Sequence, residues 1–381
     1  MSKWKMARLG DVLTVEKVTV LPENTTSALY VGLEHIAKNS GEIVSTRTLV
    51  DGEIKSAKLA FDNRHILYGK LRPNLNKVAL PDFSGVCSTD IYPLLINEAI
   101  ADKYYISSVL RHKNFVSYAS IHAHGANLPR VDEKIITAYR IPLPPLDVQR
   151  KIAVTLDTVA EIIRLRKKQL TELDLLVKSR FIEMFGNPVT NDMGWPVRRL
   201  DQIATTRLGK MLDAKQQTGD YQYKYLANFN VQWFRFDFSK LNTMDFDEAD
   251  RAEFALEAGD LLVCEGGEVG RTAIWKEERE NCFFQKALHR IRCNSEICVP
   301  EYIAWSMYFK AYTTNFDGIA SSATIAHLPG VKLKTLMFQT PPLDLQIRFA
   351  SFAAQADKSK FVIQQAIDET RMLFGSLMSE Y

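Results

Sequence analysis

The feature that most constrains this chain is a phrase that occurs twice. Residues 141–153 read IPLPPLDVQRKIA and residues 338–350 read FQTPPLDLQIRFA. Both copies carry Pro-Pro-Leu-Asp, one variable position and Gln, followed by an apolar residue and Ala. A phrase of this length that returns late in each half of one chain indicates an internal duplication.

Further matches extend the repeat over most of the sequence. Trp4, Arg8 and Leu9 correspond to Trp195, Arg199 and Leu200, Tyr105-Ile106 to Tyr302-Ile303, RHILYGK (64–70) to GDLLVCE (259–265), and NLPRV (127–131) to HLPGV (327–331). The small drift in spacing between these matches is what loop insertions between fixed elements produce. We therefore predict the order domain, helix, domain, helix, with boundaries at 1–146, 147–186, 187–343 and 344–381.

Each repeated phrase is followed by a heptad pattern. Apolar residues recur at alternating spacings of four and three, from Ile152 toward Val177 in the first copy and from Phe349 toward Leu377 in the second. This pattern predicts two helices of roughly 35 residues, about 50 Å each at 1.5 Å per residue. Pro-Pro cannot lie inside a helix, so Asp147 and Asp344 are the expected N-caps.

The two helices are expected to pair as an antiparallel coiled coil that holds the two domains at opposite ends. Arg166 and Lys360 fall on seam positions, where an unpaired buried charge would be costly. Two explanations stay open for them: the long side chains reach solvent past a partly open seam, or they make a contact that sets the register.

The two long domains read as α+β folds with mostly antiparallel sheets. Short runs of β-branched and aromatic residues, such as HILYG and GDLLVCEG, are bounded by Gly, Pro, Asn and Asp, which is typical of strands. Apolar residues spaced by three and four predict one helix over 98–112 and another over 300–315.

Composition excludes several classes of protein. The chain has 381 residues, 46% hydrophobic and 24% charged, which is ordinary for a globular protein. It shows no signal-peptide core and no membrane-length apolar run, so we expect a cytoplasmic protein. Five cysteines without C-x-x-C spacing, and an isolated His122/His124 pair, predict neither a disulfide framework nor a metal site.

Motifs for catalysis are missing. Neither Pro-Pro phrase has the preceding amide or acid and the following aromatic of the amino-methyltransferase loop, and no glycine-rich turn suits a methyl donor. The EGGEVG segment (265–270) lacks the spacing of a phosphate loop and reads as a hairpin turn. A nuclease site joining Asp82 to Asp132 and Glu133 would need residues from distant surface loops. We therefore expect no enzyme activity in this chain.

Two diverged domains at a fixed separation suit the reading of two short sequences along one DNA duplex. In its paired PPLDVQ and PPLDLQ phrases, and in the domain starts WKMARLGDV and NPVTNDMGWPVRRLDQI, the chain resembles the specificity subunit of type I restriction-modification enzymes. The resemblance covers essentially the whole chain. It implies two target-recognition domains that read a bipartite DNA site, and helices that set the gap between its halves.

The same resemblance implies partners and a division of labour. The specificity subunit would join two methyltransferase (modification) subunits and then restriction (endonuclease/translocase) subunits, and S-adenosylmethionine would bind the methyltransferase subunits rather than this chain. Apolar residues flanking the helix seams are the candidates for the partner surface. They are Ile162, Leu176, Phe181, Phe185 and Phe361.

Candidate base-reading residues are basic, amide, hydroxyl or imidazole side chains in the loops, because these pair with base edges in the major groove. In the first domain they are Lys70, Arg72, Asn74, Lys77, His124, Asn127 and Arg130. In the second they are Arg207, Lys210, Arg271, Lys286, His289, Thr324 and His327. HGANLP stands in the first domain where the family commonly has a Gly-Ser/Thr phrase.

Net charge argues against strong binding by this chain alone. The formal charge is only +3, and an acidic run over 245–260 is expected to face solvent or a partner. Affinity would then come largely from the assembled complex. An alternative is kept open: the chain is a coiled-coil assembly scaffold without sequence readout.

Overall fold

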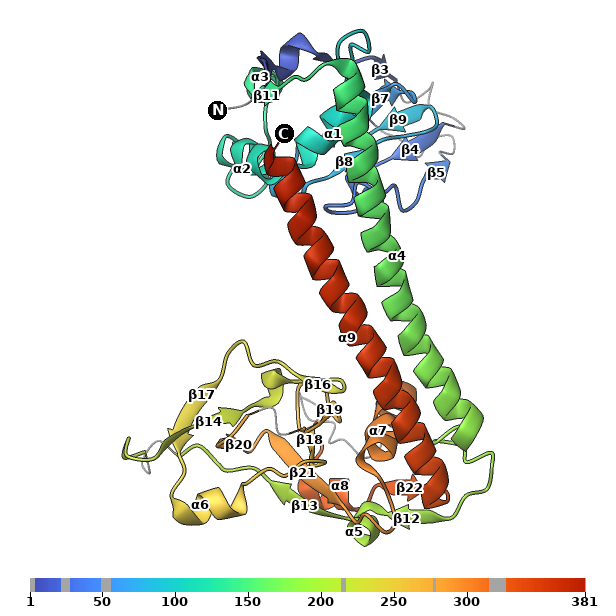
Figure 1. Cartoon of the computed structure of the whole chain (residues 1–381), viewed down its shortest axis with the longest axis vertical. Coiled ribbons are helices and arrows are strands. Elements are labelled where there is room, and N and C mark those ends of the chain that lie inside the picture. The colour runs from blue at the N-terminus through green and yellow to red at the C-terminus, as the bar shows by residue number, and fades with distance from the viewer. Residues whose placement is uncertain are drawn as a thin grey trace. The chain divides into compact units, whose positions relative to one another are not determined.

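The computed structural model describes residues 4–21, 28–48, 56–213, 217–276, 279–314 and 327–380 (Figure 1). The chain divides into two compact units, and each is treated separately. Unit 1 comprises residues 1–167 and 366–381, and unit 2 comprises residues 168–365. Each long helix therefore contributes one part to each unit.

The described residues of unit 1 form two larger sheets, a two-stranded sheet of the first and last strands, and three short helices. Its helices are α1 (Lys103–Arg111), α2 (Lys113–Ile121) and α3 (Glu133–Ala138), with 3-10 turns η1 (Leu9–Asp11), η3 (Leu33–His35) and η4 (Pro73–Leu75). Its strands are β1 (Met6–Arg8), β2 (Leu13–Val15), β3 (Thr19–Val20), β4 (Leu29–Val31), β5 (Arg47–Thr48), β6 (Lys58–Phe61), β7 (His65–Gly69), β8 (Val78–Ala79), β9 (Gly85–Cys87), β10 (Ile91–Ile96) and β11 (Arg140–Pro142). A four-stranded sheet has the order β2-β10-β7-β8, and a five-stranded sheet has the order β3-β6-β9-β4-β5.

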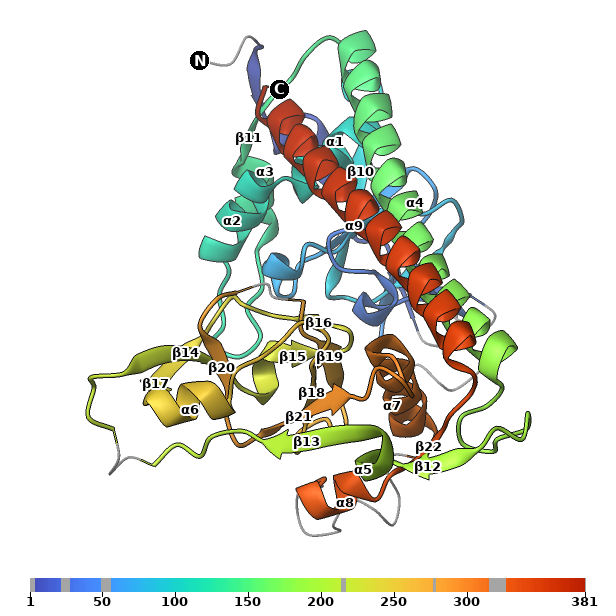
Figure 2. The same cartoon turned by 60° about the horizontal axis from the view of Figure 1, so that its bottom comes forward.

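Unit 2 repeats the central part of this plan (Figure 2). Its helices are α5 (Leu200–Ile203), α6 (Glu248–Glu253), α7 (Pro300–Thr314) and α8 (Gly330–Lys334), with η6 (Asn228–Asn230). Its strands are β12 (Val197–Arg199), β13 (Ala204–Leu208), β14 (Gln222–Leu226), β15 (Val231–Gln232), β16 (Arg235–Phe236), β17 (Asn242–Asp245), β18 (Leu261–Cys264), β19 (Thr272–Ile274), β20 (Cys282–Phe284), β21 (Leu288–Cys293) and β22 (Met337–Gln339). The sheet β13-β21-β18-β19 corresponds to β2-β10-β7-β8, and β17-β14-β20 forms a second, three-stranded sheet.

The predicted α+β class with mostly antiparallel sheets is confirmed. Among the described strand pairs, only β4 with β9 and β14 with β20 run parallel. Helices were expected at 98–112 and 300–315, and α1 and α7 occupy those segments. The short helices α2, α3, α5, α6 and α8 were not expected, because elements of four to nine residues leave little periodicity to detect.

Both long helices form. Helix α4 spans Leu146–Phe185 and α9 spans Leu343–Glu380, so each begins one residue before the expected cap and places Asp147 or Asp344 in its first turn. An acidic side chain there still interacts favourably with the positive end of the helix dipole. Seam residues such as Ile152, Leu156 and Val177 are buried, as the heptad pattern predicts.

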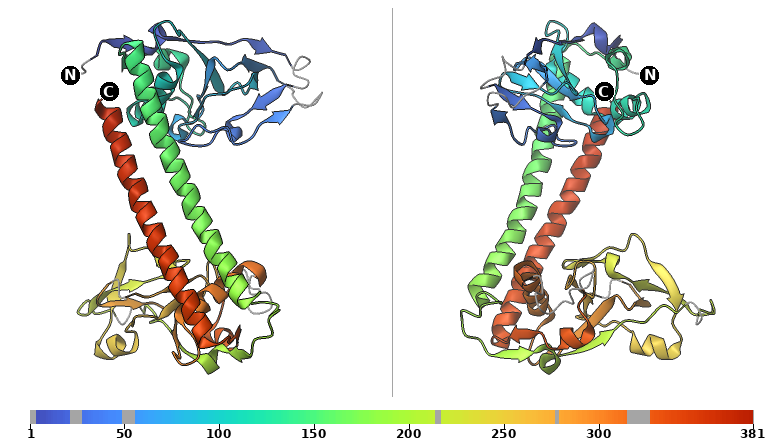
Figure 3. Two further views of the ribbon diagram at one scale, coloured as in Figure 1. Left: turned by 45° about the vertical axis from the view of Figure 1, so that its right-hand side comes forward. Right: turned by 180° about the vertical axis from the view of Figure 1, so that it is seen from behind.

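Within each unit the segments of α4 and α9 pack side by side (Figure 3). In unit 2 they run antiparallel, since Asp174 pairs with Lys360 while Phe181, further along α4, contacts Phe349, earlier on α9. In unit 1 the Arg166 guanidinium donates to the Ala366 carbonyl and the Thr370 hydroxyl. Of the two explanations for Arg166 and Lys360, cross-helix contact is therefore the one observed.

Candidate nucleic-acid interface

Two loops of unit 1 that are far apart in sequence meet at one surface. The Arg72 N–H donates to the Pro129 carbonyl at 2.7 Å, and the Val131 N–H donates to the Lys70 carbonyl at 3.0 Å. His124 and Arg130 exchange backbone hydrogen bonds of 2.8 and 2.9 Å. We call residues 70–77 and 122–131 loop cluster 1. The sequence placed all seven first-domain candidates in these two segments, and the backbone bonds bring them together.

Loop cluster 1 contains strained backbone. Arg72 and Asn76, on either side of η4, have φ values of 51° and 50°, in the left-handed region that residues with a side chain rarely adopt. Asn tolerates this conformation better than Arg does. Such strain costs on the order of 1–3 kcal/mol per residue and is concentrated at functional sites. The hydrogen bond from Arg72 to Pro129 is one contact that holds it in place.

Not every candidate side chain in loop cluster 1 is available to a ligand. Arg130 donates from Nε to Asp90 Oδ1 at 2.8 Å and from Nη2 to Asp90 Oδ2 at 3.1 Å, a bidentate pair that raises the pKa of Arg130. Lys77 donates to the Leu33 carbonyl, and burial lowers its pKa. Both side chains brace the loops rather than present a free charge.

The remaining candidates in loop cluster 1 stay accessible. Arg72, Asn74, His124 and Asn127 are exposed. The Arg72 guanidinium has one contact among the described residues, a 3.3 Å bond from Nη2 to the Asn127 carbonyl. Lys70 is half-buried, with Nζ 4.8 Å from the centre of the Tyr92 ring. Arg72, with most of its donors free and its backbone fixed, is the best-placed group for bidentate contact with an acceptor pair.

Unit 2 has the equivalent arrangement. The Leu328 N–H donates to the Glu265 carbonyl at 2.7 Å, and Gly266 forms a β-bridge with His327. We call residues 265–271 and 327–328 loop cluster 2; it corresponds to loop cluster 1 through the repeated RHILYGK/GDLLVCE and NLPRV/HLPGV segments. His327 is exposed here. Thr324, predicted from the same loop, lies outside the described residues.

Several unit 2 predictions need correction. His289 is 1% exposed, its Nε2 lies 3.0 Å from the Leu328 carbonyl, and burial lowers its pKa, so a DNA contact by this residue is wrong. Lys210 is bound by Asp250 and the Asp245 carbonyl, and Arg271 by Glu268 and the Asn228 carbonyl. Both side chains are about 15% exposed or less. Lys286 remains exposed, its Nζ 3.7 Å from the Met211 sulfur.

The acidic run over 245–260 explains where these positive charges go. Arg207 lies opposite Arg290 in the β13–β21 ladder and pairs with Glu253 of α6. Two residues beyond Arg290 on β21, Arg292 donates to Asp260 at 2.7 and 2.8 Å and to Glu257 at 2.6 Å. The run was expected to face solvent or a partner. Glu253 and Glu257 are exposed, as expected, although both also pair with arginines of their own unit. The expectation is wrong for Asp260, which is 1% exposed and paired with Arg292.

The predicted partner surface divides into two groups. Ile162, Leu176 and Phe361 are 37%, 51% and 64% exposed, as a docking surface requires. Phe181 and Phe185 are 0% exposed, so their assignment to a partner surface is wrong. Their rings pack against Tyr302 and Phe349 in the core of unit 2, because α7 covers this end of α4.

Some residues of the site were missed by reasoning from sequence. Asp90, which orients Arg130, gave no signal because it lies 40 residues away. Exposed apolar residues that share the helix surfaces were also passed over, namely Val154, Leu165, Leu175, Ile347 and Val362. The glutamines of the repeated phrase, Gln149 and Gln346, were visible as identical positions but were assigned no role.

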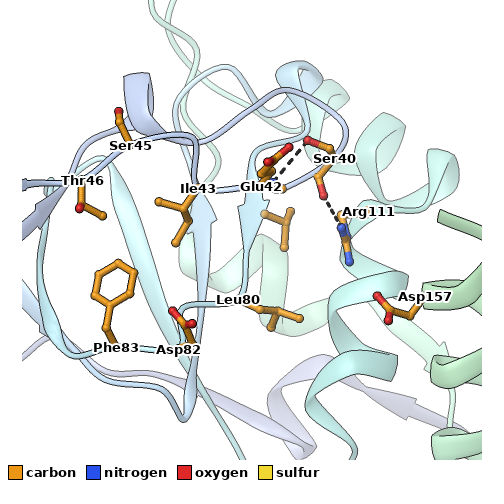
Figure 4. A pocket seen from close by; sticks show the side chains of 12 residues that line it. Ser40, Glu42, Ile43, Ser45, Thr46, Leu80, Asp82, Phe83, Arg111 and Asp157 are labelled. Carbon is orange, nitrogen blue, oxygen red and sulfur yellow. Dashed lines mark hydrogen bonds between the residues drawn. The ribbon is translucent and has the colours of Figure 1, made fainter. Parts of the chain in front are cut away.

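A cavity of about 520 Å³ lies in unit 1 beside α4 (Figure 4). Its lining includes Arg111 at the end of α1, Asp157 of α4 and Asp82, with the Arg111 Nη1 donating to the Ser40 carbonyl at 2.6 Å. Burial lowers the pKa of Arg111, and the charge of Asp157 opposes this. The Asn76 amide donates to the Arg111 carbonyl at 3.1 Å, which connects the cavity wall to loop cluster 1.

The described residues also bear on metal binding and on membrane insertion. They contain no group of three or more His, Cys, Asp or Glu side chains placed to hold a metal ion. Of the helices in this part of the chain, none is long and apolar enough to cross a membrane.

Comparison with known proteins agrees with the duplicated layout. The family model described as "Type I restriction modification DNA specificity domain" matches residues 1–175 and again 193–370. An Escherichia coli protein named "Type I restriction enzyme EcoDI specificity subunit" is 26% identical over 207 residues, covering 53% of this chain and 46% of that protein. The chain thus spans about half of that relative. A Methanocaldococcus jannaschii MjaVIII specificity subunit is 24% identical, covering 81% of this chain and 76% of the relative.

Solved structures share the fold over the full length. A chain from a study titled "Structural basis underlying complex assembly and conformational transition of the type I R-M system" aligns with a TM-score of 0.65 at 18% identity, covering 99% of this chain and 97% of the other. The type I restriction-modification S subunit from M. genitalium aligns with a TM-score of 0.59 at 14% identity, covering 100% and 96%. Since the family model accounts for most of both halves, the chain belongs to the type I restriction-modification DNA specificity family.

Proposed function

We propose that this chain is a sequence-specific DNA recognition subunit of a type I restriction-modification complex, with each loop cluster reading one half of a bipartite site. One observation carries the proposal. Both halves of a duplicated chain bring the same two loop segments together, yet the exposed side chains on them differ. Equivalent scaffolds with different surfaces are what two unlike half-sites require.

Loop cluster 1 has suitable chemistry for reading base edges. Arginine pairs bidentately with guanine, and asparagine with adenine, in the major groove. Arg72, Asn74 and Asn127 are exposed together. Arg130, fixed by Asp90, keeps the loop in shape and is a positioning residue. Among the described residues of unit 2, Lys286 and His327 are exposed candidates outside the ion pairs described above, whereas Arg207 is exposed but paired with Glu253.

The chain is proposed to act within a larger assembly. A net charge of +3 and the internal neutralisation of the Arg207–Arg292 strip leave little free positive charge for phosphate binding. Binding of nonspecific DNA depends on such free charges. Modification subunits that themselves contact the duplex would supply the missing affinity.

Two methyltransferase subunits are the proposed first partners, followed by restriction subunits. Large exposed apolar residues on the long helices support this: Val154, Ile162 and Leu165 on the unit 1 part of α4, and Leu175 and Leu176 on its unit 2 part. Contiguous exposed apolar patches commonly mark protein interfaces. S-adenosylmethionine and catalysis are assigned to those partners, and this chain is proposed to be non-catalytic.

The experiment is methylation profiling of DNA from cells that express this chain with its methyltransferase subunits. A gapped motif with two unlike half-sites is expected. Replacing residues 1–140 with those of a relative should change one half-site and leave the other intact. The alternative is an assembly scaffold without sequence readout, which predicts a complex that methylates DNA without sequence preference. A domain swap that changes both half-sites would contradict the proposal that each domain reads one half-site.

A further inference from the structure

The glutamine of the repeated phrase is buried in both units and makes the same three hydrogen bonds. Gln149 and Gln346 are each 0% exposed. Gln149 Nε2 donates to the carbonyls of Ile100 and Pro144 at 3.0 and 2.8 Å, and its Oε1 accepts from the Asp102 N–H at 2.8 Å.

The bonds of Gln346 match those of Gln149 one for one. Its Nε2 donates to the carbonyls of Ile297 and Pro341 at 3.1 and 2.8 Å, and its Oε1 accepts from the Val299 N–H at 3.1 Å. The two sites share the side chain, the number of bonds and the places of their partners in the repeat. They therefore derive from one feature of the ancestral domain.

The partners lie at a joint between three segments. Pro144 and Pro341 belong to the link that leads into α4 or α9. Asp102 is the N-cap of α1, where its Oδ1 accepts from the Tyr105 N–H at 2.9 Å, and Val299 immediately precedes α7. One amide thus ties the first turn of each long helix to the start of a helix inside its own reading domain.

The hydrogen bonds of this amide fix the angle between the long helix and its domain more than they hold the two together. Both donor hydrogens and one acceptor position are used, so a change in the angle between the segments breaks several bonds at once. Apolar packing at the same joint is non-directional and tolerates small rotations. The amide is the group that distinguishes one helix angle from neighbouring ones.

Small angles matter because the helix is long. The 40 residues of α4 extend about 60 Å at 1.5 Å per residue. A tilt of about 3° at its first turn moves the far end by about 3 Å, close to the 3.4 Å spacing of base pairs along one strand. An error of one base pair therefore corresponds to a tilt of only about 3° at this joint.

We infer that Gln149 and Gln346 are positioning residues for the length of the DNA gap: each fixes the angle at which its reading domain meets its long helix. The inference rests on the proposed function. The inference gives a role to the repeated segments 141–153 and 338–350, which are not proposed to contact bases or phosphates.

The test uses the full chain assembled with its methyltransferase subunits, and the variants Gln149→Met and Gln346→Met. Methionine keeps the length of the side chain but forms none of the three bonds. Gln169→Met is the matched control, since Gln169 is exposed on the same helix. Methylation rates are measured on duplexes with the native gap, with gaps one base pair shorter or longer, and with single changes in either half-site.

Each methionine variant is expected to lose about tenfold of the discrimination between native and altered gaps, equivalent to about 1.4 kcal/mol, while discrimination at half-site bases stays unchanged. Gln169→Met should behave as the parent. Gln149→Ala and Gln346→Ala, which remove the same three bonds with a smaller side chain, provide a second pair of variants if methionine hinders folding.

Several results would overturn the inference. One is unchanged discrimination between gap lengths in a folded, active variant. Another is an equal loss of discrimination between gap lengths and between bases. A third is failure of every variant to assemble, which would assign the amides to stability alone. If the parent complex shows no gapped specificity, the proposed function itself fails. The two failures are therefore distinguishable.

Discussion

Phe181 and Leu176 lie five residues apart on α4, and replacing each by alanine should have opposite consequences. Phe181 is 0% exposed, with ring centroids 5.0 Å from Phe185, 5.0 Å from Phe309 and 5.2 Å from Phe349. Truncating a buried phenylalanine costs about 3–5 kcal/mol. Leu176 is 51% exposed, so Leu176→Ala should change the free energy of unfolding by about 0.5 kcal/mol or less.

Urea denaturation followed by tryptophan fluorescence measures this difference. Four of the five tryptophans, at positions 195, 233, 275 and 305, lie in unit 2, so the signal reports the unit that contains Phe181. With a slope of about 2 kcal/mol per molar urea, Phe181→Ala should lower the midpoint by about 2 M. Leu176→Ala should leave the midpoint in place and weaken copurification of the methyltransferase subunits. Equal destabilisation by both variants, or a shift under about 0.5 M for Phe181→Ala, would refute the assignment of core and surface.

Three further predictions follow from the charges. Arg72→Ala should reduce the discrimination between correct and incorrect bases by about 1–3 kcal/mol at one position of one half-site. The measurement is the rate of methylation of duplexes with single base changes. Equally weakened methylation at all positions would contradict base reading by Arg72. The double variant Asp250→Asn, Glu253→Gln should free Lys210 and Arg207 from their ion pairs. In fluorescence anisotropy with a duplex that lacks the recognition site, the plot of log binding constant against log salt concentration should then become steeper by about 0.9 for each new phosphate contact. An unchanged slope would show that these cations do not reach DNA. Burial alone would raise the pKa of Asp245, but hydrogen bonds from the Gly219 N–H, the Gln222 amide and Thr218 lower it to about 2 from its ordinary 3.8. The contribution of ionised Asp245 to the stability of the fold is therefore complete above pH 3.8 and is lost as the pH falls toward 2. Asp245→Asn should abolish that part of the acid sensitivity in thermal melts between pH 4 and 2, and parallel melting curves for parent and variant would count against it.

Secondary structure and duplication could be predicted because their signals are local. All five residues of HILYG are buried on β7, as a short apolar run bounded by turn residues predicts. A heptad seam can likewise be recognised from the sequence of its own helix. The best-matching segments of the repeat contain Gln149 and Gln346. Each of these side chains makes hydrogen bonds to three backbone groups, two of which lie almost 50 residues earlier in the chain. The identity of those partners, Ile100 and Asp102 among them, could not be read from the phrase itself.

The errors share a physical origin, since each concerns a contact between residues distant in sequence. Arg207 and Lys210 carry the right chemistry for DNA but meet the carboxylates of α6, 40 or more residues later. His289 lies on β21, and the Leu328 carbonyl that its Nε2 contacts comes from another loop. Phe181 and Phe185 continue the apolar pattern of α4, and only the docking of α7 turns that surface into core.

The most direct test of the account lengthens the two helices. Inserting seven residues near Gln169 and seven near Ala366 keeps the heptad register and adds about 10 Å to each helix at 1.5 Å per residue. That length equals about three base pairs at 3.4 Å each. Methylation profiling of cells that carry the insertion variant should show both half-sites with unchanged bases and a gap longer by about three base pairs. An active variant with the original gap would contradict the claim that the helices set the spacing, and would leave the duplicated phrase a role in assembly alone.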